Sequence, residues 1–291
     1  MSDSVKDPDA AKAPVGLVGL GAMGRPAARH LAAAGHPTFC FDPDDAATQA
    51  VAADGIRAAA SLSELAAVSS VVLILVPSDG DVIEVCDPSA GLLAGARSGT
   101  VFLVCSSVRP DTCQAVAAMA AERGVDVLDA ALTGGVRAAE AGTVNLLVGG
   151  DAAVLDRIRP SLRPWTGTVH HLGQLGAGQV GKTVNNLCHW GQLAAIVEAL
   201  RLGRALGVEP SALRAAVMDG PADSRTLREM QLMRLTWYAK DLVNAFAMAD
   251  SADQDLPVAR VVREAMNHIS VDDIAELYQP RSTITGRVGA R

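Results

Sequence analysis

The stretch that decides the fold lies at residues 15–24 and reads VGLVGLGAMG. It places a GxGxxG pattern at Gly19, Gly21 and Gly24, directly after a short apolar run and before an alanine-rich segment of helical pattern. This pattern becomes specific when a strand precedes it and a helix follows it. Both conditions hold here, so we expect a strand, a tight glycine turn and a helix.

The glycines of this turn suit a dinucleotide. Gly19 permits the tight turn, Gly21 lets a pyrophosphate approach the backbone, and Gly24 lets the helix pack close to the strand. The N-terminus of the helix then stabilises the phosphate charge. The residues that we expect to bind the cofactor here are Gly19, Leu20, Gly21, Ala22, Met23 and Gly24.

An acidic residue at the end of the next apolar run indicates which dinucleotide binds. Asp42 lies 23 residues after Gly19 and is followed by Pro43, Asp44 and Asp45 rather than by an arginine. An acid at this place hydrogen-bonds the ribose hydroxyls and repels a 2′-phosphate. The sequence therefore predicts NAD in preference to NADP. The alternative, a glycine turn with a solvated aspartate, is disfavoured by the full context.

The first half of the chain alternates apolar runs with helical patterns, which is typical of βαβ units and a parallel sheet. We expect strands at Val15–Gly19, Pro37–Phe41, Val71–Pro77, Thr100–Cys105 and Val125–Leu128. Two further runs, Thr143–Val148 and Thr168–Leu172, are candidates to extend the sheet. The expected fold class is α/β, with an N-terminal Rossmann-type doubly wound parallel sheet.

The pattern changes after Gly173. Residues 178–206 contain no proline and precede Gly207, which predicts one helix of about eight turns. Further helices follow, separated by Pro210, Gly220-Pro221 and Pro257, without a strand signal. We expect a disordered lead-in at 1–12, a dinucleotide-binding domain at 13–174, and an all-helical substrate and oligomerisation domain at 175–291 joined by the long helix.

Composition limits the possible functions. The chain has 291 residues, of which 49% are hydrophobic, 3% aromatic and 20% charged, with a formal net charge of −7. The apolar fraction excludes disorder as the main state. The acidic balance and the few aromatic residues argue against binding of nucleic acid.

No apolar run approaches the roughly 20 residues that span a membrane, and residues 1–13 lack the apolar core of a signal peptide. The cysteines number five, an odd count without CxxC spacing, so we expect buried thiols in a reducing cytoplasm. No histidine pair has the spacing of metal ligands, and we expect no metal site.

The start of the long helix carries a lysine in apolar surroundings. Lys182 and Asn186 are four residues apart and share one helical face. A lysine in an apolar cleft can have a lowered pKa and act as an acid or a base. Spacing alone leaves open the alternative of a lysine whose stem lies on the apolar surface with its ammonium in water.

At these residues the sequence resembles the β-hydroxyacid dehydrogenase family, which includes 3-hydroxyisobutyrate dehydrogenase and tartronate semialdehyde reductase. Four motifs carry the resemblance, in the family's order, between Val15 and about Ala249. They are Gly19–Gly24, similar to GLGxMG; Asp129–Gly135 with Ala139 and Gly142-Thr143, similar to DAPVSGG…A…GT; Gly176–Asn186, similar to GxGxxxKxxNN; and Lys240-Asp241-Leu242, similar to KDL.

The resemblance implies a role for each matching residue. Lys182 would be the catalytic acid and base, and Asn186 would bind substrate oxygens. Thr133, Gly134 and Gly135 would hold the substrate carboxylate through a hydroxyl and backbone N–H groups. The cofactor contacts that it implies are Val76, Pro77, Ser107 and Lys240. The family also implies a homodimer or a homotetramer.

The sequence departs from the family's pattern at several positions. Thr133 replaces the family's usual serine, and Ala131 replaces its proline. The family has a Ser-Thr pair where this chain has Ser106-Ser107, and the acid that usually precedes that pair is replaced here by Val104 and Cys105. Arg137 lies two residues after the glycine pair. We consider two roles for it, a contact to a second anionic group of the substrate and a solvent-facing position.

Three aromatic or imidazole side chains lie near these motifs. His189 follows Lys182 by seven residues, and Trp237 and Tyr238 precede Lys240. For each we expect packing within the helical part rather than a contact to substrate, and of the two aromatic residues Trp237 is the better candidate for the substrate pocket.

We therefore expect an NAD-dependent dehydrogenase of a small anionic 3-hydroxy acid, or a reductase of the matching semialdehyde. An imine reductase is an alternative, but that group generally lacks the lysine found here at Lys182. A 6-phosphogluconate dehydrogenase has a much longer chain and a KxxHN motif, whereas this chain has Asn185 in place of that histidine. A cofactor-binding module without catalysis is the non-enzymatic alternative, against which Lys182 and Asn186 argue.

Overall fold

The computed structural model describes residues 12–278, and its first part is built on one eight-stranded sheet. The strands are β1 (Val15–Val18), β2 (Thr38–Phe41), β3 (Arg57–Ala58), β4 (Val71–Ile74), β5 (Val101–Val104), β6 (Asp126–Thr133), β7 (Val144–Gly149) and β8 (Thr166–Gly173). Apart from Lys12, the expected lead-in lies outside the described residues. The sequence analysis missed β3, a strand of only two residues.

The strand order β3-β2-β1-β4-β5-β6-β7-β8 confirms a doubly wound sheet. Every pair of neighbouring strands is parallel except β6 and β7, which are antiparallel. A parallel crossover needs a dozen or more residues. The connection from Gly134 to Thr143 is shorter and holds only the helix α7 (Gly135–Glu140), so the chain returns beside β6 in the opposite direction. The run at Thr143–Val148 does extend the sheet, as β7, but as its one antiparallel neighbour.

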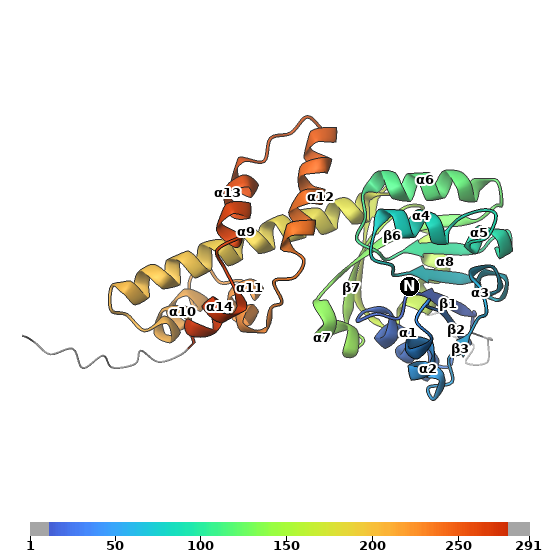
Figure 1. Ribbon diagram of the computed structural model, residues 1–291, viewed down its shortest axis with the longest axis horizontal. Helices are drawn as coiled ribbons and strands as arrows, with labels where there is room; N and C mark the ends of the chain where they lie inside the picture. The colour runs from blue at the N-terminus through green and yellow to red at the C-terminus, as the bar shows by residue number, and fades with distance from the viewer. Residues whose placement is uncertain (1–11, 279–291) are drawn as a thin grey trace, which may run out of the picture. The chain divides into compact units, whose positions relative to one another are not determined.

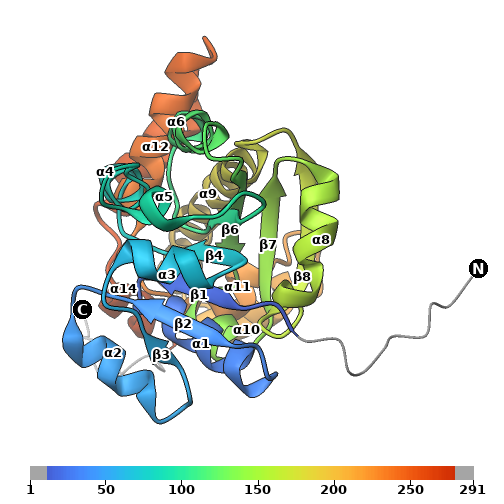
Figure 2. The ribbon, with the colours of Figure 1, turned by 90° about the vertical axis from the view of Figure 1, so that its right-hand side faces the viewer.

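Helices cover both faces of the sheet (Figure 2). One face packs on α1 (Gly24–Ala33), α2 (Asp45–Ala52), α7 and α8 (Ala152–Leu162). The other packs on α3 (Leu62–Val68), α4 (Asp79–Val85), α5 (Leu92–Gly95) and α6 (Pro110–Ala121). Along β4, Val71 and Leu73 enter the first core, while Val72 and Ile74 enter the second. Burial on both faces explains why the central strands are apolar throughout rather than alternating.

The second part of the chain is helical (Figure 1). Its helices are α9 (Ala177–Ala205), α10 (Pro210–Met218), α11 (Arg225–Glu229), the short 3₁₀ helix η1 (Met230–Leu232), α12 (Tyr238–Ser251), α13 (Pro257–Met266) and α14 (Val271–Glu276). Between residues 183 and 278 the structure contains no strand, as expected. Pro210 and Pro257 begin helices, because a proline at the first helical position loses no hydrogen bond.

The chain forms two compact units, and the division falls inside α9, between Lys182 and Thr183. The expected domain boundary between residues 174 and 175 lies just before this helix and stays a prediction. The second unit has its own core, in which Trp190 and Leu193 of α9 pack with Met230, Val262 and Met266. Each unit therefore buries its own set of apolar side chains.

The cysteines are all free. Cys40, Cys86, Cys105 and Cys113 are buried in the first unit as expected, but Cys188 on α9 is exposed, so that expectation was wrong for one thiol. Within residues 12–278, no helix has the length and apolar character needed to cross a bilayer.

Candidate active site

In the glycine turn between β1 and α1, Gly21 is the one of the three motif glycines with free space beside it. A Cβ at Gly19 would lie 2.4 Å from the Leu75 carbonyl oxygen, and a Cβ at Gly24 would lie 2.0 Å from the Gly19 oxygen. Gly19 also has a φ of +91°, which favours glycine. A Cβ at Gly21, by contrast, would meet nothing within 4 Å. Gly19 and Gly24 thus serve the close packing of the chain, and Gly21 provides the open approach that a pyrophosphate needs.

Asp42 follows β2 and is oriented by the turn itself. Its Oδ2 accepts a hydrogen bond from the Leu20 N–H at 2.7 Å, and its Oδ1 accepts one from the Asp44 N–H at 2.9 Å. The carboxylate is therefore fixed beside the glycine turn before any ligand arrives. Each oxygen keeps a further lone pair for an external hydroxyl.

The loops that follow β4 and β5 are joined by a buried serine. Ser106 Oγ accepts from the Val76 N–H at 2.8 Å and donates to the Ile74 carbonyl at 3.3 Å. Ser107, the residue expected at the cofactor, is half-buried beside it, and Pro77 is exposed. Because β4 and β5 are parallel neighbours, these loops leave the same edge of the sheet as the glycine turn.

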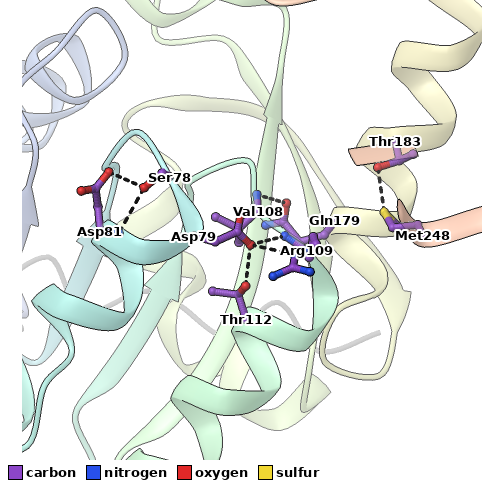
Figure 3. Close-up of polar contacts among 9 residues, drawn as sticks. All are labelled: Ser78, Asp79, Asp81, Val108, Arg109, Thr112, Gln179, Thr183 and Met248. Atoms are coloured by element: carbon purple, nitrogen blue, oxygen red, sulfur yellow. Dashed lines mark hydrogen bonds and ion pairs between the residues drawn. The ribbon is translucent and has the colours of Figure 1, made fainter. Parts of the chain in front are cut away.

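A second contact between the same loops comes from Asp79, at the start of α4 (Figure 3). Its Oδ1 accepts from the Arg109 N–H at 2.9 Å and from Thr112 Oγ1 at 2.5 Å, and the Arg109 Nε lies 3.6 Å away. Burial alone would raise the pKa of Asp79. The hydrogen bonds from Thr112 and Arg109, together with the Arg109 charge, outweigh burial and hold that pKa below its usual range.

The start of α9 is fastened to β6 by a buried carboxylate. Asp129 is 0% exposed, its Oδ1 accepts from the Gly176 N–H at 2.5 Å, and its Oδ2 accepts from the Gln179 N–H at 2.8 Å. Burial raises the pKa of Asp129 above its usual range, while these backbone N–H groups oppose the rise. The carboxylate is tightly enclosed, because a Cβ at Gly178 would lie 2.6 Å from Oδ2 and a Cβ at Gly149 would lie 2.4 Å from Oδ1.

The segment expected to bind the substrate carboxylate follows directly on β6. Thr133 ends the strand half-buried, and Gly134 takes a left-handed conformation with a φ of +105° at the start of α7. Gly135 is exposed, also has a positive φ, and a Cβ there would meet nothing within 4 Å. Backbone N–H groups at such glycines are accessible to an anion.

Lys182 lies on α9, six residues after Gly176, and is half-buried. Asn186 follows one turn later and is 8% exposed, with its Oδ1 accepting from the Asn185 side-chain amide at 3.0 Å. The helix thus carries both residues on one face, as the spacing predicts.

The KDL segment begins α12, in the second unit. The indole N–H of Trp190 donates to Asp241 Oδ2 at 3.0 Å. The Thr183 hydroxyl donates to the Met248 sulfur at 3.2 Å (Figure 3), so two contacts fix α12 along α9. Lys240, the residue before Asp241, is half-buried. The hydrogen bond from the indole to the Asp241 carboxylate sets the position of the first turn of α12.

Of the ring side chains near these motifs, His189 and Tyr238 are packed and Trp237 is exposed. His189 Nδ1 lies 2.9 Å from Thr226 Oγ1 and its ring contacts Trp190, and Tyr238 packs edge-on against Trp190. Packing was the expectation for both. It was wrong for Trp237, which is 60% exposed.

Within the first unit, the structure gathers most of the expected residues at one sheet edge. The loops that hold Gly19–Gly24, Val76 and Ser107 follow β1, β4 and β5, which are consecutive in the sheet. Sequence reasoning missed the polar residues that join these loops, which are Asp79, Ser106, Asp129 and Gln179. Asp129 stood in a recognised motif, but its partners are 47 and 50 residues away in the sequence. Among residues 12–278 no cluster of His, Cys, Asp or Glu could hold a metal ion.

Comparison with known proteins gives two matching family models. Residues 14–173 match a family described as the NAD binding domain of 6-phosphogluconate dehydrogenase. Residues 176–277 match a family described as the NAD-binding domain of NADP-dependent 3-hydroxyisobutyrate dehydrogenase.

Curated relatives and solved structures agree with these matches. A 2-(hydroxymethyl)glutarate dehydrogenase of Eubacterium barkeri is 35% identical over 84% of this chain and 80% of its own length. A probable 3-hydroxyisobutyrate dehydrogenase of Mycobacterium tuberculosis is 38% identical over 68% of this chain and 67% of its own. A solved 3-hydroxyisobutyrate dehydrogenase of that organism, with L-serine, superposes with a TM-score of 0.83 at 28% identity, covering 93% of this chain and 100% of the other. Imine reductases share the fold at 17–19% identity.

Proposed function

The chain belongs to the β-hydroxyacid dehydrogenase family, and from this premise we propose that it is an NAD-dependent oxidoreductase acting on a small 3-hydroxy acid or its semialdehyde. The observation that carries the proposal is the composition of one sheet edge. The open Gly21 turn, the Ser107 loop and the segment Thr133–Gly135 follow β1, β5 and β6, which run in the same direction, and the start of the Lys182 helix is bonded to Asp129 and Ser106 beside them. A cofactor site, an anion site and an acid–base group are the three parts that the reaction requires.

The residues fit a nicotinamide dinucleotide because Gly21 is open, whereas Gly19 and Gly24 are closed by backbone. When bound, the nicotinamide accepts a hydride from the alcohol carbon or returns one to the carbonyl carbon. In oxidation, the neutral Lys182 amine takes the hydroxyl proton; in reduction, the Lys182 ammonium gives a proton to the carbonyl oxygen. Thr133 and the N–H groups of Gly134 and Gly135 hold the carboxylate, and Asn186 binds substrate oxygens.

The proposed preference for NAD rests on Asp42. Two backbone N–H groups fix its carboxylate beside the glycine turn. A fixed anion there accepts hydrogen bonds from both ribose hydroxyls and repels a 2′-phosphate. The same turn has no arginine among the three residues after Asp42 that could offset this repulsion.

The direct test is a screen of NAD⁺ and NADP⁺ against a panel of small hydroxy acids, with nicotinamide absorbance as the readout. We expect turnover of at least one 3-hydroxy acid, with kcat/KM higher for NAD⁺ by about 10²-fold, which corresponds to about 2.7 kcal/mol, because the Asp42 carboxylate binds the ribose hydroxyls and repels a 2′-phosphate. The 2-hydroxy and 4-hydroxy isomers of the same acid are the matched controls. Turnover of none of these acids would contradict the enzymatic assignment, and equal use of NADP⁺ would contradict the role of Asp42.

Arg137 suggests that the substrate carries a second anionic group. It is exposed on α7, two residues beyond the carboxylate segment that ends at Gly135. One relative is named for a substrate with two carboxylates, 2-(hydroxymethyl)glutarate. A guanidinium at this place can bind such a group bidentately.

Replacing Arg137 by alanine tests this role. We expect kcat/KM to fall by about 10-fold for a dianionic hydroxy acid and by less than about 2-fold for its monoanionic counterpart, since a charged hydrogen bond contributes about 1.5 kcal/mol. Arg163→Ala, at the exposed end of α8, removes the same charge elsewhere in the unit and is the matched control. An unchanged ranking of the two substrates would show that Arg137 only faces solvent.

A further inference from the structure

Gln179 is a buried side chain in the first turn of α9, and both its oxygen and its nitrogen form hydrogen bonds. It is 2% exposed. Its Oε1 accepts from the Val108 N–H at 3.1 Å (Figure 3), and its Nε2 donates to the Ser106 carbonyl at 3.0 Å. Its own backbone N–H donates to Asp129. One residue therefore contacts the loop after β5 with its side chain and Asp129 of β6 with its backbone.

The partners of Gln179 belong to the parts that the proposed reaction uses. Ser106 and Val108 flank Ser107, one of the residues expected to contact the cofactor. Three residues after Gln179, less than one turn along α9, stands Lys182. The bonds of Gln179 thus determine how the lysine helix sits along the loop after β5.

The chemistry of this contact requires both a donor and an acceptor. The Val108 N–H needs an acceptor and the Ser106 carbonyl needs a donor, and a carboxamide offers one of each. An ionised carboxylate offers acceptors only, so its negatively charged oxygen would repel the Ser106 carbonyl oxygen. A protonated carboxylic acid again offers one acceptor and one donor, with nearly the shape of the carboxamide.

We propose that Gln179 is a positioning residue, which sets the register between the lysine helix and the loop of Ser107 and so holds Lys182 at the distance that proton transfer needs. Proton transfer requires about 2.6–3.2 Å between the heavy atoms, and a displacement of about 1 Å can lower the rate by about 10²-fold. The proposal rests on the proposed function, since it concerns the same lysine. It adds a residue that touches neither substrate nor cofactor.

Gln179→Glu makes this role dependent on pH. Burial raises the pKa of a carboxyl group, so the introduced side chain is protonated at the acid end of the pH range and ionised at the alkaline end. We expect kcat close to that of the wild type, within about 3-fold, while the side chain is protonated, and about 10²-fold lower once it is ionised. The measurement is kcat across the pH range, with thermal unfolding recorded at each pH to keep every assay well below the melting temperature.

Two further variants make the result decisive. Gln179→Met retains the volume but neither hydrogen bond, so its kcat should be about 10²-fold low at every pH, in a profile parallel to that of the wild type. Gln174→Glu adds the same charge at an exposed side chain five residues earlier and should leave the profile unchanged. A Gln179→Glu profile that parallels the wild type, or a Gln179→Met variant with normal kcat, would overturn the proposal. Absence of turnover in the wild type would instead overturn the proposed function on which it rests.

Discussion

Replacing Lys182 by alanine should lower kcat by about 10²–10⁴-fold, the usual contribution of a positioned acid or base, and leave the Kd for NAD⁺ within about 2-fold of the wild type. The reason is that Lys182 stands on α9 and not in the glycine turn or the loops after β4 and β5, where we place the cofactor. Steady-state assays of turnover measure the change in kcat, and fluorescence titration with NAD⁺ measures the change in Kd.

A second variant distinguishes proton transfer from simple charge. Lys182→Arg keeps the positive charge, but a guanidinium does not release its proton in the accessible pH range. If Lys182 moves a proton, this variant should be as slow as the alanine variant; if it acts only by charge, activity should persist. Val180→Ala, at an exposed position on the same helix, controls for general effects of substitution. Near-normal kcat in Lys182→Ala would refute the proposed chemistry.

Replacing Asp129 by asparagine should give the largest loss of stability among single polar substitutions in the first unit. The asparagine amide can accept from only one of the Gly176 and Gln179 N–H groups, and its own NH₂ would face the other. A buried donor left without an acceptor costs about 1–3 kcal/mol, and more where the lost partner was charged, so we expect the free energy of unfolding to fall by about 3 kcal/mol. Chemical denaturation measures this directly.

The matched control lies on the same strand. Asp126→Asn makes the same substitution three residues earlier, where the carboxylate meets Arg157 in an exposed ion pair. Exposed ion pairs contribute about 0–1 kcal/mol, so this variant should remain nearly as stable as the wild type. Equal losses for the two variants would show that Asp129 does not anchor α9.

The decrease in the free energy of unfolding caused by Asp129→Asn should also depend on pH. Because burial raises the pKa of Asp129, the folded chain binds this proton more readily than the unfolded chain. The contribution of this carboxyl to stability is therefore full at acid pH and declines as the pH rises through its raised pKa. The difference between the wild type and Asp129→Asn should shrink over that interval, because asparagine does not titrate.

Much of the fold could be predicted from local pattern. The apolar runs that became β1, β4 and β5 are buried on both faces, so they are visible as apolar stretches between turn residues. The reversal at β7 was not predicted, because it depends on the length of a connection that itself contains a short helix. The long β6 was also underestimated, since Asp129 interrupts its apolar run.

The site could be predicted only where a motif is contiguous. Gly19–Gly24 and the Gly176–Asn186 segment each carry their logic within a few residues, so sequence spacing suffices. Gln179 and Asp129 act through partners from distant strands, and their importance appears only when the sheet brings those strands together. Trp237 shows the converse error, because an apolar residue beside a motif need not be packed.

The four buried thiols have a practical consequence. Burial raises the pKa of Cys40 to about 11 and of Cys86 to about 12, so both stay protonated and shielded in the folded chain, as do Cys105 and Cys113. Only Cys188, in the second unit, is accessible to an alkylating reagent. The number of alkylated cysteines per chain, read by mass spectrometry, therefore rises from one towards five as the sheet unfolds. The number of alkylated cysteines therefore reports on unfolding of the first unit, which Asp129 stabilises, without an introduced label.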